Sequence, residues 1–444
     1  MDSTEKKMIK RVVASSLIGS TIEWYDFFLY GVVAGIVFGQ MYFPTGNPVV
    51  STMLAFGTFA AGFVARPLGG IVFGHFGDKI GRKSMLILTL TIMGISTTLV
   101  AFLPTYGKIG IAAPIILLVI RLVQGLAVGG EWGGAVLMTY EHAPESRRGL
   151  YASFPQIGLS IGLLFASGVV GLLSFMLSPE QFLNWGWRVA FGISALLVFI
   201  GLWIRLNVDE SPEFKEIKDN NVESAIPFKE MWKGNTGNII AGMGARYIDG
   251  VFFNIMGVFS ITYLTQNMAV SNNVALLGVS AAAFVMCFFI PLFGYVSDKI
   301  GRYRTYFVGS LVTGFSAIPA FMLMATPGMS NSIIWMAIII PFGIFYAAVY
   351  GPEAALFSEL FEPKFRYTGI SFVYQFSGIF ASGLTPMIAT YLLSLSDGFP
   401  IWIVAYVIFA GIVSAVSVRW IAATKKKTLL KNVAKVEHKS ITQL

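Results

Sequence analysis

Residues 74–83 read GHFGDKIGRK, and residues 294–303 read GYVSDKIGRY. Both stretches contain the pattern Gly-x-x-x-Asp-Lys-Ile-Gly-Arg, and they lie 220 positions apart. The same offset pairs Gly149 with Gly369. A fixed offset of this kind indicates an internal repeat, so we expect the 444-residue chain to consist of two related halves.

The chain is too apolar for a typical water-soluble domain. Hydrophobic residues make up 55% of it and charged residues only 12%, whereas soluble domains carry about 25% charged residues. A transmembrane helix needs about 20 predominantly apolar residues. The candidate spans are 12–39, 53–75, 84–103, 111–139, 150–176, 188–206, 238–265, 274–295, 305–325, 332–357, 369–394 and 400–422. We therefore expect an all-α integral membrane protein with twelve transmembrane helices in two pseudo-symmetric six-helix bundles.

A polar segment separates the sixth predicted span from the seventh. It is rich in Asp, Glu and Lys and contains Pro212 and Pro227. The predicted organisation is an N-terminal six-helix bundle at 1–206, a cytoplasmic linker at 207–237, a C-terminal six-helix bundle at 238–422 and a basic cytoplasmic tail at 423–444.

Positive charges are distributed unequally among the predicted loops. With the N-terminus placed in the cytoplasm, nearly all of the 31 Lys and Arg residues fall on the cytoplasmic side, and the external loops contain only Lys108. This pattern follows the positive-inside rule and predicts that both ends are cytoplasmic. It also explains the net charge of +8 without a nucleic-acid partner. The absence of an N-x-S/T sequon favours a prokaryotic source, so we expect a multi-pass protein of the inner membrane.

The repeated loop resembles the signature of the major facilitator superfamily, which has two six-helix bundles. The stretch RLVQGLAVGGEWGG at 121–134 is similar to the helix 4 motif of that superfamily. Three further short motifs resemble those of the metabolite:proton symporter family. They are EWYDFFLYG at 23–31, RPLGG at 66–70 and GGEWGGA at 129–135. That family includes shikimate, proline/betaine, 2-oxoglutarate and citrate carriers. The resemblance implies secondary active transport by alternating access.

The same resemblance implies a role for the repeated loop itself. In the superfamily, the Asp and Arg of this loop join a charge network that holds the inward face closed. The matching gating residues are Gly74, Asp78, Gly81 and Arg82 in the first copy and Asp298, Gly301 and Arg302 in the second. Tyr303 replaces the basic residue expected after Arg302, so we expect the second gate to be weaker.

Ionisable groups inside the predicted spans are candidates for function, because each charged side chain costs about 2.5–3.5 kcal/mol there on insertion scales. These groups are Glu23, Asp26, Arg66, Arg121, Glu131, Arg246, Asp249 and Glu353. A carboxylate such as Asp26 must either pair with a cation or take up a proton. Asp26 is therefore predicted to be a proton or substrate site, and the alternative is a fixed ion pair that orients helices.

The candidates divide into two sets. The proton-coupling candidates are Asp26, Glu23, Glu131 and Arg121, since the Arg of the helix 4 motif is implicated in proton movement in the superfamily. The substrate-binding candidates are Tyr30, Arg66, Gln124, Trp132, Arg246, Asp249 and Glu353. Glu23, Asp26 and Tyr30 have the spacing i, i+3, i+7, which places them on one helical face.

The offset of 220 also pairs Asp26 with Arg246. If it holds without a gap, the first and seventh helices face each other across the central cavity with opposite charges at equivalent places. The competing interpretation is that Asp249, three residues after Arg246, pairs with Arg246 within its own helix.

The predicted function is proton-coupled symport of a small organic metabolite. Three cations, Arg66, Arg121 and Arg246, favour a carboxylate such as a shikimate-like acid. The alternatives are a zwitterionic osmolyte of the proline/betaine type and a proton-independent uniporter or exchanger.

Enzyme functions are disfavoured. The sequence has no Walker A loop, no H-E-x-x-H motif and no convincing nucleophile–base set. The single cysteine, Cys287, cannot form a disulfide within the chain, and no Cys/His metal spacing occurs. We expect no cofactor and no metal. The expected partners are a small-molecule substrate, a proton and the lipid bilayer, with the protein a monomer.

Overall fold

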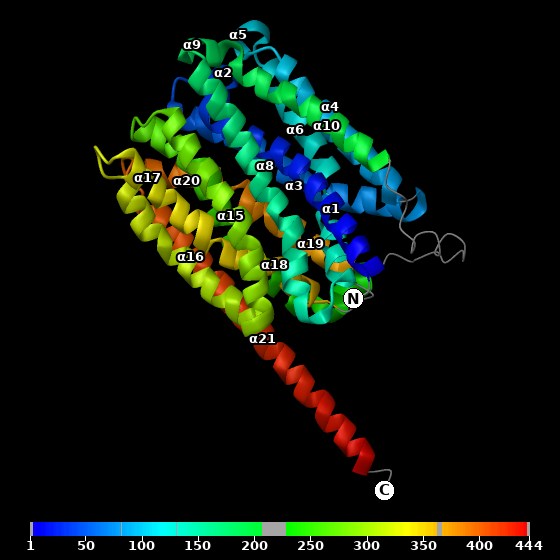
Figure 1. Ribbon diagram of the computed structural model, residues 1–444. Coiled ribbons are helices and arrows are strands. Elements are labelled where there is room, and N and C mark those ends of the chain that lie inside the picture. The colour runs from blue at the N-terminus through cyan, green and yellow to red at the C-terminus, as the bar shows by residue number, and fades with distance from the viewer. Residues whose placement is uncertain (1–2, 81, 130, 207–227, 362–365, 442–444) are drawn as a thin grey trace.

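The computed structural model describes residues 3–80, 82–129, 131–206, 228–361 and 366–441. At some helical positions, among them Gly74, Asp78, Arg82 and Glu131, only the backbone is described. All regular elements in these ranges are helices, and the long ones run side by side in one bundle (Figure 1).

The two halves of the chain each supply a series of α-helices, several of them interrupted by π-helical turns, which are labelled η. The main elements of the first half are α1 (Ser3–Val33), η1 (Ala34–Phe38), α2 (Gly39–Tyr42), α3 (Pro48–Ile80), α4 (Arg82–Phe102), α5 (Tyr106–Ile109), α6 (Ala112–Val128), α7 (Glu131–His142), α8 (Arg148–Met176), α9 (Pro179–Gln181), η3 (Phe182–Gly186) and α10 (Trp187–Leu206). Those of the second half are α12 (Phe228–Ala245), α13 (Tyr247–Asn254), η4 (Ile255–Phe259), α14 (Ser260–Thr262), η5 (Tyr263–Asn267), α15 (Asn272–Ile300), α16 (Arg302–Met324), α17 (Asn331–Ile338), η6 (Ile339–Phe345), α18 (Ala347–Ser358), α19 (Arg366–Gly378), η8 (Ile379–Gly383), α20 (Thr385–Ser394) and α21 (Ile401–Ile441).

The predicted membrane architecture is confirmed. Ten helical stretches in the described ranges are long and apolar enough to cross a membrane. Two shorter apolar helices, Ile87–Phe102 and Ala112–Val128, lie where the third and fourth spans were predicted. Many large apolar side chains on these helices are exposed, for example Phe199 and Phe288. Exposure of this kind is expected of helices that face lipid.

The halves contact each other mainly through α8 and α3 of the first half. α8 packs on α15 and α18 of the second half, and α3 packs on α19, η8 and α20. α1 lies inside the first half against α8, and α12 and α13 lie against α21 in the second. The first and seventh spans are the most buried of those identified, each 94% buried in its most apolar window. The charged residues on these spans therefore lie inside the protein.

Glycines allow α3 and α6 to approach backbone to backbone. A Cβ atom on Gly125 would overlap the carbonyl oxygen of Gly62, and one on Gly69 would overlap that of Leu126. Small residues permit this close packing of membrane helices. The contact holds Arg121, on α6, against α3, where a side chain at Gly62 would leave its guanidinium no room.

Several helix ends differ from the predicted ones. The span expected at 111–139 is divided, because α6 ends at Val128 and α7 begins at Glu131. The helix expected to start at 238 starts at Phe228, and α21 continues past 422 to Ile441. An apolar run marks only the part of a helix that crosses lipid. Polar residues such as Lys and Glu extend a helix into water because their helix propensity is high.

Candidate functional site

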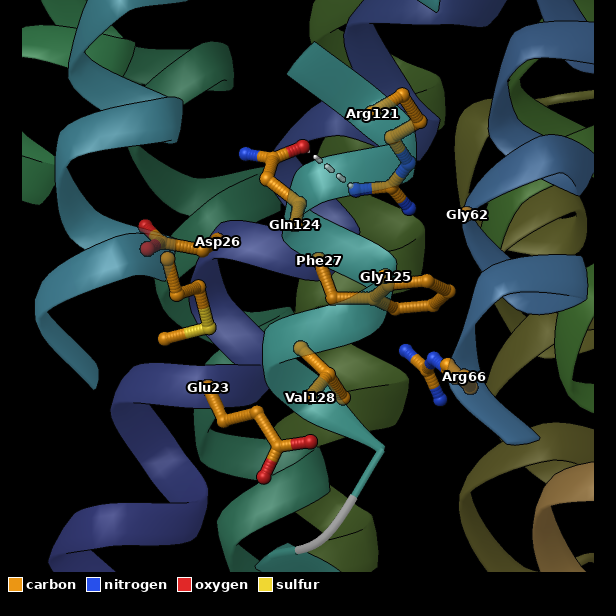
Figure 2. Close-up of a pocket in the computed structure, with 10 residues that line it drawn as sticks. Glu23, Asp26, Phe27, Gly62, Arg66, Arg121, Gln124, Gly125 and Val128 are labelled. Atoms are coloured by element: carbon orange, nitrogen blue, oxygen red, sulfur yellow. Dashed lines mark hydrogen bonds between the residues drawn. The ribbon is translucent and has the colours of Figure 1, made fainter. Parts of the chain in front are cut away.

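A pocket lies among α1, α3 and α6 (Figure 2). Its lining residues are Glu23, Asp26, Phe27, Gly62, Arg66, Met93, Arg121, Gln124, Gly125 and Val128. The pocket has about 270 Å³ of empty space, which includes space open to solvent. The part wide enough for a water molecule holds about one. In this state the pocket has no room for a metabolite.

A chain of hydrogen bonds joins the two charged ends of this pocket. Arg121 Nη1 donates to Gln124 Oε1 at 3.2 Å, and Gln124 Nε2 donates to Thr97 Oγ1 at 2.7 Å. Thr97 Oγ1 in turn donates to Asp26 Oδ2 at 3.2 Å. Gln124 lies between Arg121 and Asp26 in Figure 2. Asp26 thus connects to the cation through two neutral side chains and not through direct contact.

Asp26 has only hydroxyl groups around its carboxylate. It is 2% exposed, its Oδ1 has no hydrogen-bond partner, and the Ser194 hydroxyl is the second one close to it. The fixed ion pair considered as the alternative role for Asp26 is not formed with any residue of the described ranges. A buried carboxylate without a cation is expensive in its charged form, so this site favours the uptake of a proton.

The two arginines of this pocket lie against aromatic rings. The Arg121 guanidinium is 4.3 Å from the ring centre of Tyr30 and 5.0 Å from that of Phe27. The Arg66 guanidinium is 4.5 Å from the same Phe27 ring, which lies between the two arginines in Figure 2. Arg121 Nε and Nη2 have no hydrogen-bond partner, so the donors are available to an anion. Glu23 is the carboxylate that acts on Arg66 electrostatically.

A second polar cluster lies in the other half. Arg246, between α12 and α13, is 2% exposed, and its Nε is 3.6 Å from Asp249 Oδ2 and 3.8 Å from Glu353 Oε1. Tyr346 donates a 2.5 Å hydrogen bond to Asp249 Oδ1. Arg246 Nη1 also donates to the Ser377 hydroxyl at 3.3 Å. This half therefore holds its cation by direct ion pairs.

An aromatic stack connects this cluster to the first half. The Tyr374 ring, on α19, lies 3.6 Å from the Trp132 ring of α7 with an angle of 11° between the planes. The Arg246 guanidinium also lies against the Tyr374 ring, 3.5 Å from the ring centre. Trp132 Nε1 donates to Gln156 Oε1 at 3.1 Å. Trp132, which the sequence suggested as a cavity residue, thus lies at the interface between the halves.

A second pocket adjoins Arg246 and takes its walls from both halves. Its lining residues are Trp24, Phe27, Phe28, Phe63, Leu159, Arg246, Asp249, Phe253, Asn254, Tyr346, Tyr374 and Ser382. Phe27 lines both pockets and separates them. The second pocket combines an ion-pair cluster with aromatic walls, and the part of it wide enough for a water molecule holds about one.

The expected placement of Asp26 and Arg246 on facing helices stays a prediction. Arg246 is buried, and its ion-pair partners are Asp249, as the competing interpretation held, and Glu353. The π-helical turns η1 and η4 begin 221 positions apart, one more than the offset of the repeated loop.

Other proteins are similar to this chain in sequence and in fold. A family model described as "Sugar (and other) transporter" matches residues 12–243, and one described as "Major Facilitator Superfamily" matches residues 247–444. The chain is 37% identical to the shikimate transporter of Escherichia coli, over 92% of this chain and 93% of that one. The chain belongs to the major facilitator superfamily. It is a membrane transporter and not an enzyme, and the family resemblance seen in the sequence is confirmed.

Two further proteins are similar to this transporter, one in sequence and one in fold. The proline/betaine transporter of Escherichia coli is 32% identical, over 93% of this chain and 84% of that one. A partially occluded, inward-open structure of the xylose transporter XylE from E. coli has a TM-score of 0.72 at 16% identity. That alignment covers 94% of this chain and 97% of that one. The structural match supports the fold alone.

The second copy of the repeated loop, which the resemblance predicts to be a gate, joins the two halves of the transporter at one end. Asp298 accepts hydrogen bonds from the backbone of Gly149 at 2.8 Å and Leu150 at 2.9 Å, at the start of α8. Arg302 Nη2 lies 3.2 Å from Asp298 Oδ1, and Arg302 also pairs with Glu359. A carboxylate at a helix N-terminus is favourable because it accepts from unpaired N–H groups.

Two details of this gate were not anticipated. Gly301 has φ of 99°, a backbone conformation that favours glycine, which explains the Gly of the motif. Lys425 of α21 donates to Glu359 at 3.3 Å and to Tyr303 at 3.5 Å, so the tail brings a positive charge beside Tyr303. Of the first copy of the motif, Gly81 lies outside the described residues. For Gly74, Asp78 and Arg82, and for the candidate Glu131, the side chains lie outside them.

The opposite end is also bridged. Gln266 Nε2 donates to the Gly35 carbonyl at 3.0 Å, and the Ser167 and Ser280 hydroxyls are 2.8 Å apart. Each contact joins one half to the other. Contacts between the halves at both ends describe an occluded state of the transporter.

Some residues of the site were missed by the sequence. Thr97, Ser194, Gln156 and Tyr374 are buried polar residues inside apolar helices, and no charge marked them as unusual. Thr97 lies on the third predicted span, which supplied no candidate, yet it is the residue that contacts Asp26. A search for hydroxyl and amide side chains within the spans would have found these four.

Proposed function

We propose that this transporter is a proton-coupled symporter of a small organic carboxylate. The observation that carries the proposal is Asp26, which is buried, has no cation in contact and is joined to Arg121 through Gln124 and Thr97. Such a carboxylate exchanges a proton more readily than one held in an ion pair, because its charged form lacks compensation.

The relay gives a physical route from the proton to the substrate. Thr97 can donate its single hydroxyl proton either to Asp26 at 3.2 Å or to the Met93 carbonyl at 3.0 Å. A protonated Asp26 no longer needs that donor, so Thr97 and Gln124 are free to reorient. Because Gln124 holds Arg121 Nη1, reorientation changes the donors that Arg121 offers to an anion.

The substrate class follows from the cations and from the relatives. Arg66 and Arg121 lie on either side of Phe27 without a direct ion-pair partner among the described residues, and the second pocket adds Arg246. A relative over nearly the whole chain is a shikimate transporter. We therefore assign the substrate to small organic carboxylates. A second candidate substrate is a zwitterion. Proline/betaine transporters are also relatives, and Asp249 lines the second pocket.

The cycle proposed here is alternating access with both chain ends in the cytoplasm and a single chain as the working unit. The gate at Asp298 and Arg302 then lies at the cytoplasmic end and opens when α8 and α15 separate. The contacts of Gln266 and Ser280 lie at the external end. The positive charges of the N-terminal arm and the tail support this orientation.

The test replaces Asp26 in purified transporter reconstituted into liposomes. Under an imposed proton gradient, wild type should accumulate labelled shikimate or labelled betaine, and Asp26→Asn should reduce accumulation at least tenfold while retaining exchange of substrate across the membrane. Glu180→Gln is the matched control, because Glu180 is an exposed carboxylate on the short helix α9. Unchanged gradient-driven accumulation by Asp26→Asn would refute the proposed coupling.

A further inference from the structure

The cluster around Arg246 contains one carboxylate to which the symport proposal gives no role. Glu353 on α18 is 0% exposed, and neither of its oxygens has a hydrogen-bond partner. Its contact with a charged group is the 3.8 Å approach of Oε1 to Arg246 Nε. A fully buried carboxylate with no donor is the least compensated acidic group in the described part of the second half.

The neighbouring carboxylate takes the available donors. Asp249 accepts a hydrogen bond from Tyr346 and lies closer to Arg246 Nε, at 3.6 Å, than Glu353 does. If both carboxylates were ionised, two negative charges would share one positive charge in a sealed apolar interior. A buried charge without compensation is strongly unfavourable, and a neutral acid avoids most of that cost. These contacts therefore favour an ionised Asp249 and a protonated Glu353.

Among the described residues, Arg246 is the one cation that acts on Glu353. The charged groups that act on it are Asp249 and Arg246. The other titratable groups around it are the phenols of Tyr306 on α16, Tyr346 and Tyr350 on either side of the start of α18, and Tyr374 on α19. Phenols are neutral at physiological pH. They cannot offset a second negative charge.

We propose that Glu353 is a second proton-binding site, protonated in the occluded state and linked to an anionic group of the substrate beside Arg246. The linkage to substrate rests on the proposed function. Protonation makes the set of Arg246, Asp249 and Glu353 neutral. An organic carboxylate that enters the second pocket toward Arg246 is then not repelled by Glu353, whereas an ionised Glu353 opposes it. Proton and substrate favour each other's binding, and the coupling is reciprocal.

This places proton binding in both halves. Asp26 binds its proton beside the first pocket, and Glu353 binds its proton beside the second. Two sites predict that more than one proton accompanies each substrate molecule when both carboxylates release their protons in the same cycle. A monoanionic substrate would then be carried with net positive charge.

Infrared spectroscopy tests the protonation of Glu353 without any substrate. Wild-type transporter in liposomes should show the C=O stretching band of a protonated carboxylic acid, shifted in D₂O. Glu353→Gln should remove that band, and Glu353→Asp should retain one. Asp249→Asn should also remove it, because Arg246 then has a single carboxylate partner and Glu353 becomes ionised. Asp26→Asn identifies the separate contribution of Asp26.

Two results would overturn the proposal. One is a spectrum of folded Glu353→Gln that keeps the whole carboxylic-acid band of the wild type. The other is persistence of the Glu353 band in Asp249→Asn, which would contradict the charge argument. Because no substrate is present, these results do not depend on symport. Conversely, gradient-driven accumulation unaffected by Asp26→Asn would refute the proposed function and leave the Glu353 band as it is.

Discussion

The two halves of this transporter hold their buried charges in different ways. In the first half, Asp26 and Arg121 are separated by two neutral side chains, which pass hydrogen bonds between them. In the second half, Arg246 contacts Asp249 and Glu353 directly. The chain is a repeat in sequence and in fold, yet the chemistry of the two centres has diverged.

This difference separates a mobile site from a fixed one. A relay of Thr and Gln side chains can change partners at little cost, because each donor has an alternative acceptor within reach. A buried ion pair cannot be broken cheaply, since each charge left behind is desolvated. We therefore expect protonation in the first half to rearrange hydrogen bonds, and the second half to combine structural support with substrate binding and the proton held by Glu353.

The largest expected effect is the loss of stability on removing Arg246. Arg246→Ala leaves the ionised Asp249 without its cation in the interior, and breaking a buried pair in this way costs about 3–5 kcal/mol. Arg121→Ala removes one hydrogen bond and contacts with aromatic rings, for which about 1–2 kcal/mol is expected. Chemical unfolding of both variants in detergent micelles measures the difference.

The triple variant Arg246→Met, Asp249→Asn, Glu353→Gln provides the control for that comparison. It removes all the charges together, so stability should return toward wild type while transport stays lost. Equal destabilisation by Arg246→Ala and Arg121→Ala would show that the two halves do not differ in the way their contacts suggest.

The sequence predicted the fold better than it predicted the partners of each charge. Twelve apolar runs, a repeated loop and an asymmetric distribution of Lys and Arg together determine the architecture, because the bilayer imposes length and polarity on every span. Helix ends were less predictable. Gly129, at the end of α6, lies so close to the α3 backbone that a Cβ atom there would overlap the Arg66 carbonyl, and no local pattern in the sequence reveals that contact.

Within the site, the sequence identified the buried charges but not how they combine. Asp26, Arg121, Arg246 and Glu353 stand out because charge is rare in a membrane span. Which carboxylate meets which cation depends on how each helix is rotated, and that rotation is not visible from spacing. Neutral partners such as Thr97 are common in apolar helices, so composition could not single them out.

A smaller effect is expected from breaking the relay at Thr97. Thr97→Val keeps the shape of the side chain but leaves Asp26 without its donor and Gln124 Nε2 without its acceptor. Buried polar groups left unpaired cost about 1–3 kcal/mol. We expect reduced unfolding stability and at least a tenfold loss of gradient-driven uptake in liposomes.

Thr97→Ser is the matched control, since it retains the hydroxyl and should keep most of the coupling. Ser310 on α16 is a fully buried hydroxyl of the other half that donates only to the Tyr306 carbonyl, so Ser310→Ala should leave coupling intact. Normal gradient-driven uptake by Thr97→Val would exclude the hydrogen-bond relay as the connection between Asp26 and Arg121.

The smallest expected effect concerns the stack that links the two centres. The Trp132 ring of the first half stacks on the Tyr374 ring, and the Arg246 guanidinium also lies against the Tyr374 ring. An aromatic pair contributes about 0.5–1.5 kcal/mol beyond its buried area. Because this pair exists only while the halves are together, Trp132→Leu should shift the equilibrium away from the occluded state by that amount, and Trp132→Phe by less.

The distance between spin labels on the exposed residues Arg147 and Arg304 reports that equilibrium, in a Cys287→Ser background that leaves no native thiol. In Trp132→Leu, a larger fraction of molecules should show the longer distance between the labels. The shift can be only as large as the change that the substitution makes in the free-energy difference between the two states. If the distance distribution does not change, the stack contributes equally to open and occluded states. Phe27, the residue that lines both pockets, would then be the next candidate for a connection between the two charged centres.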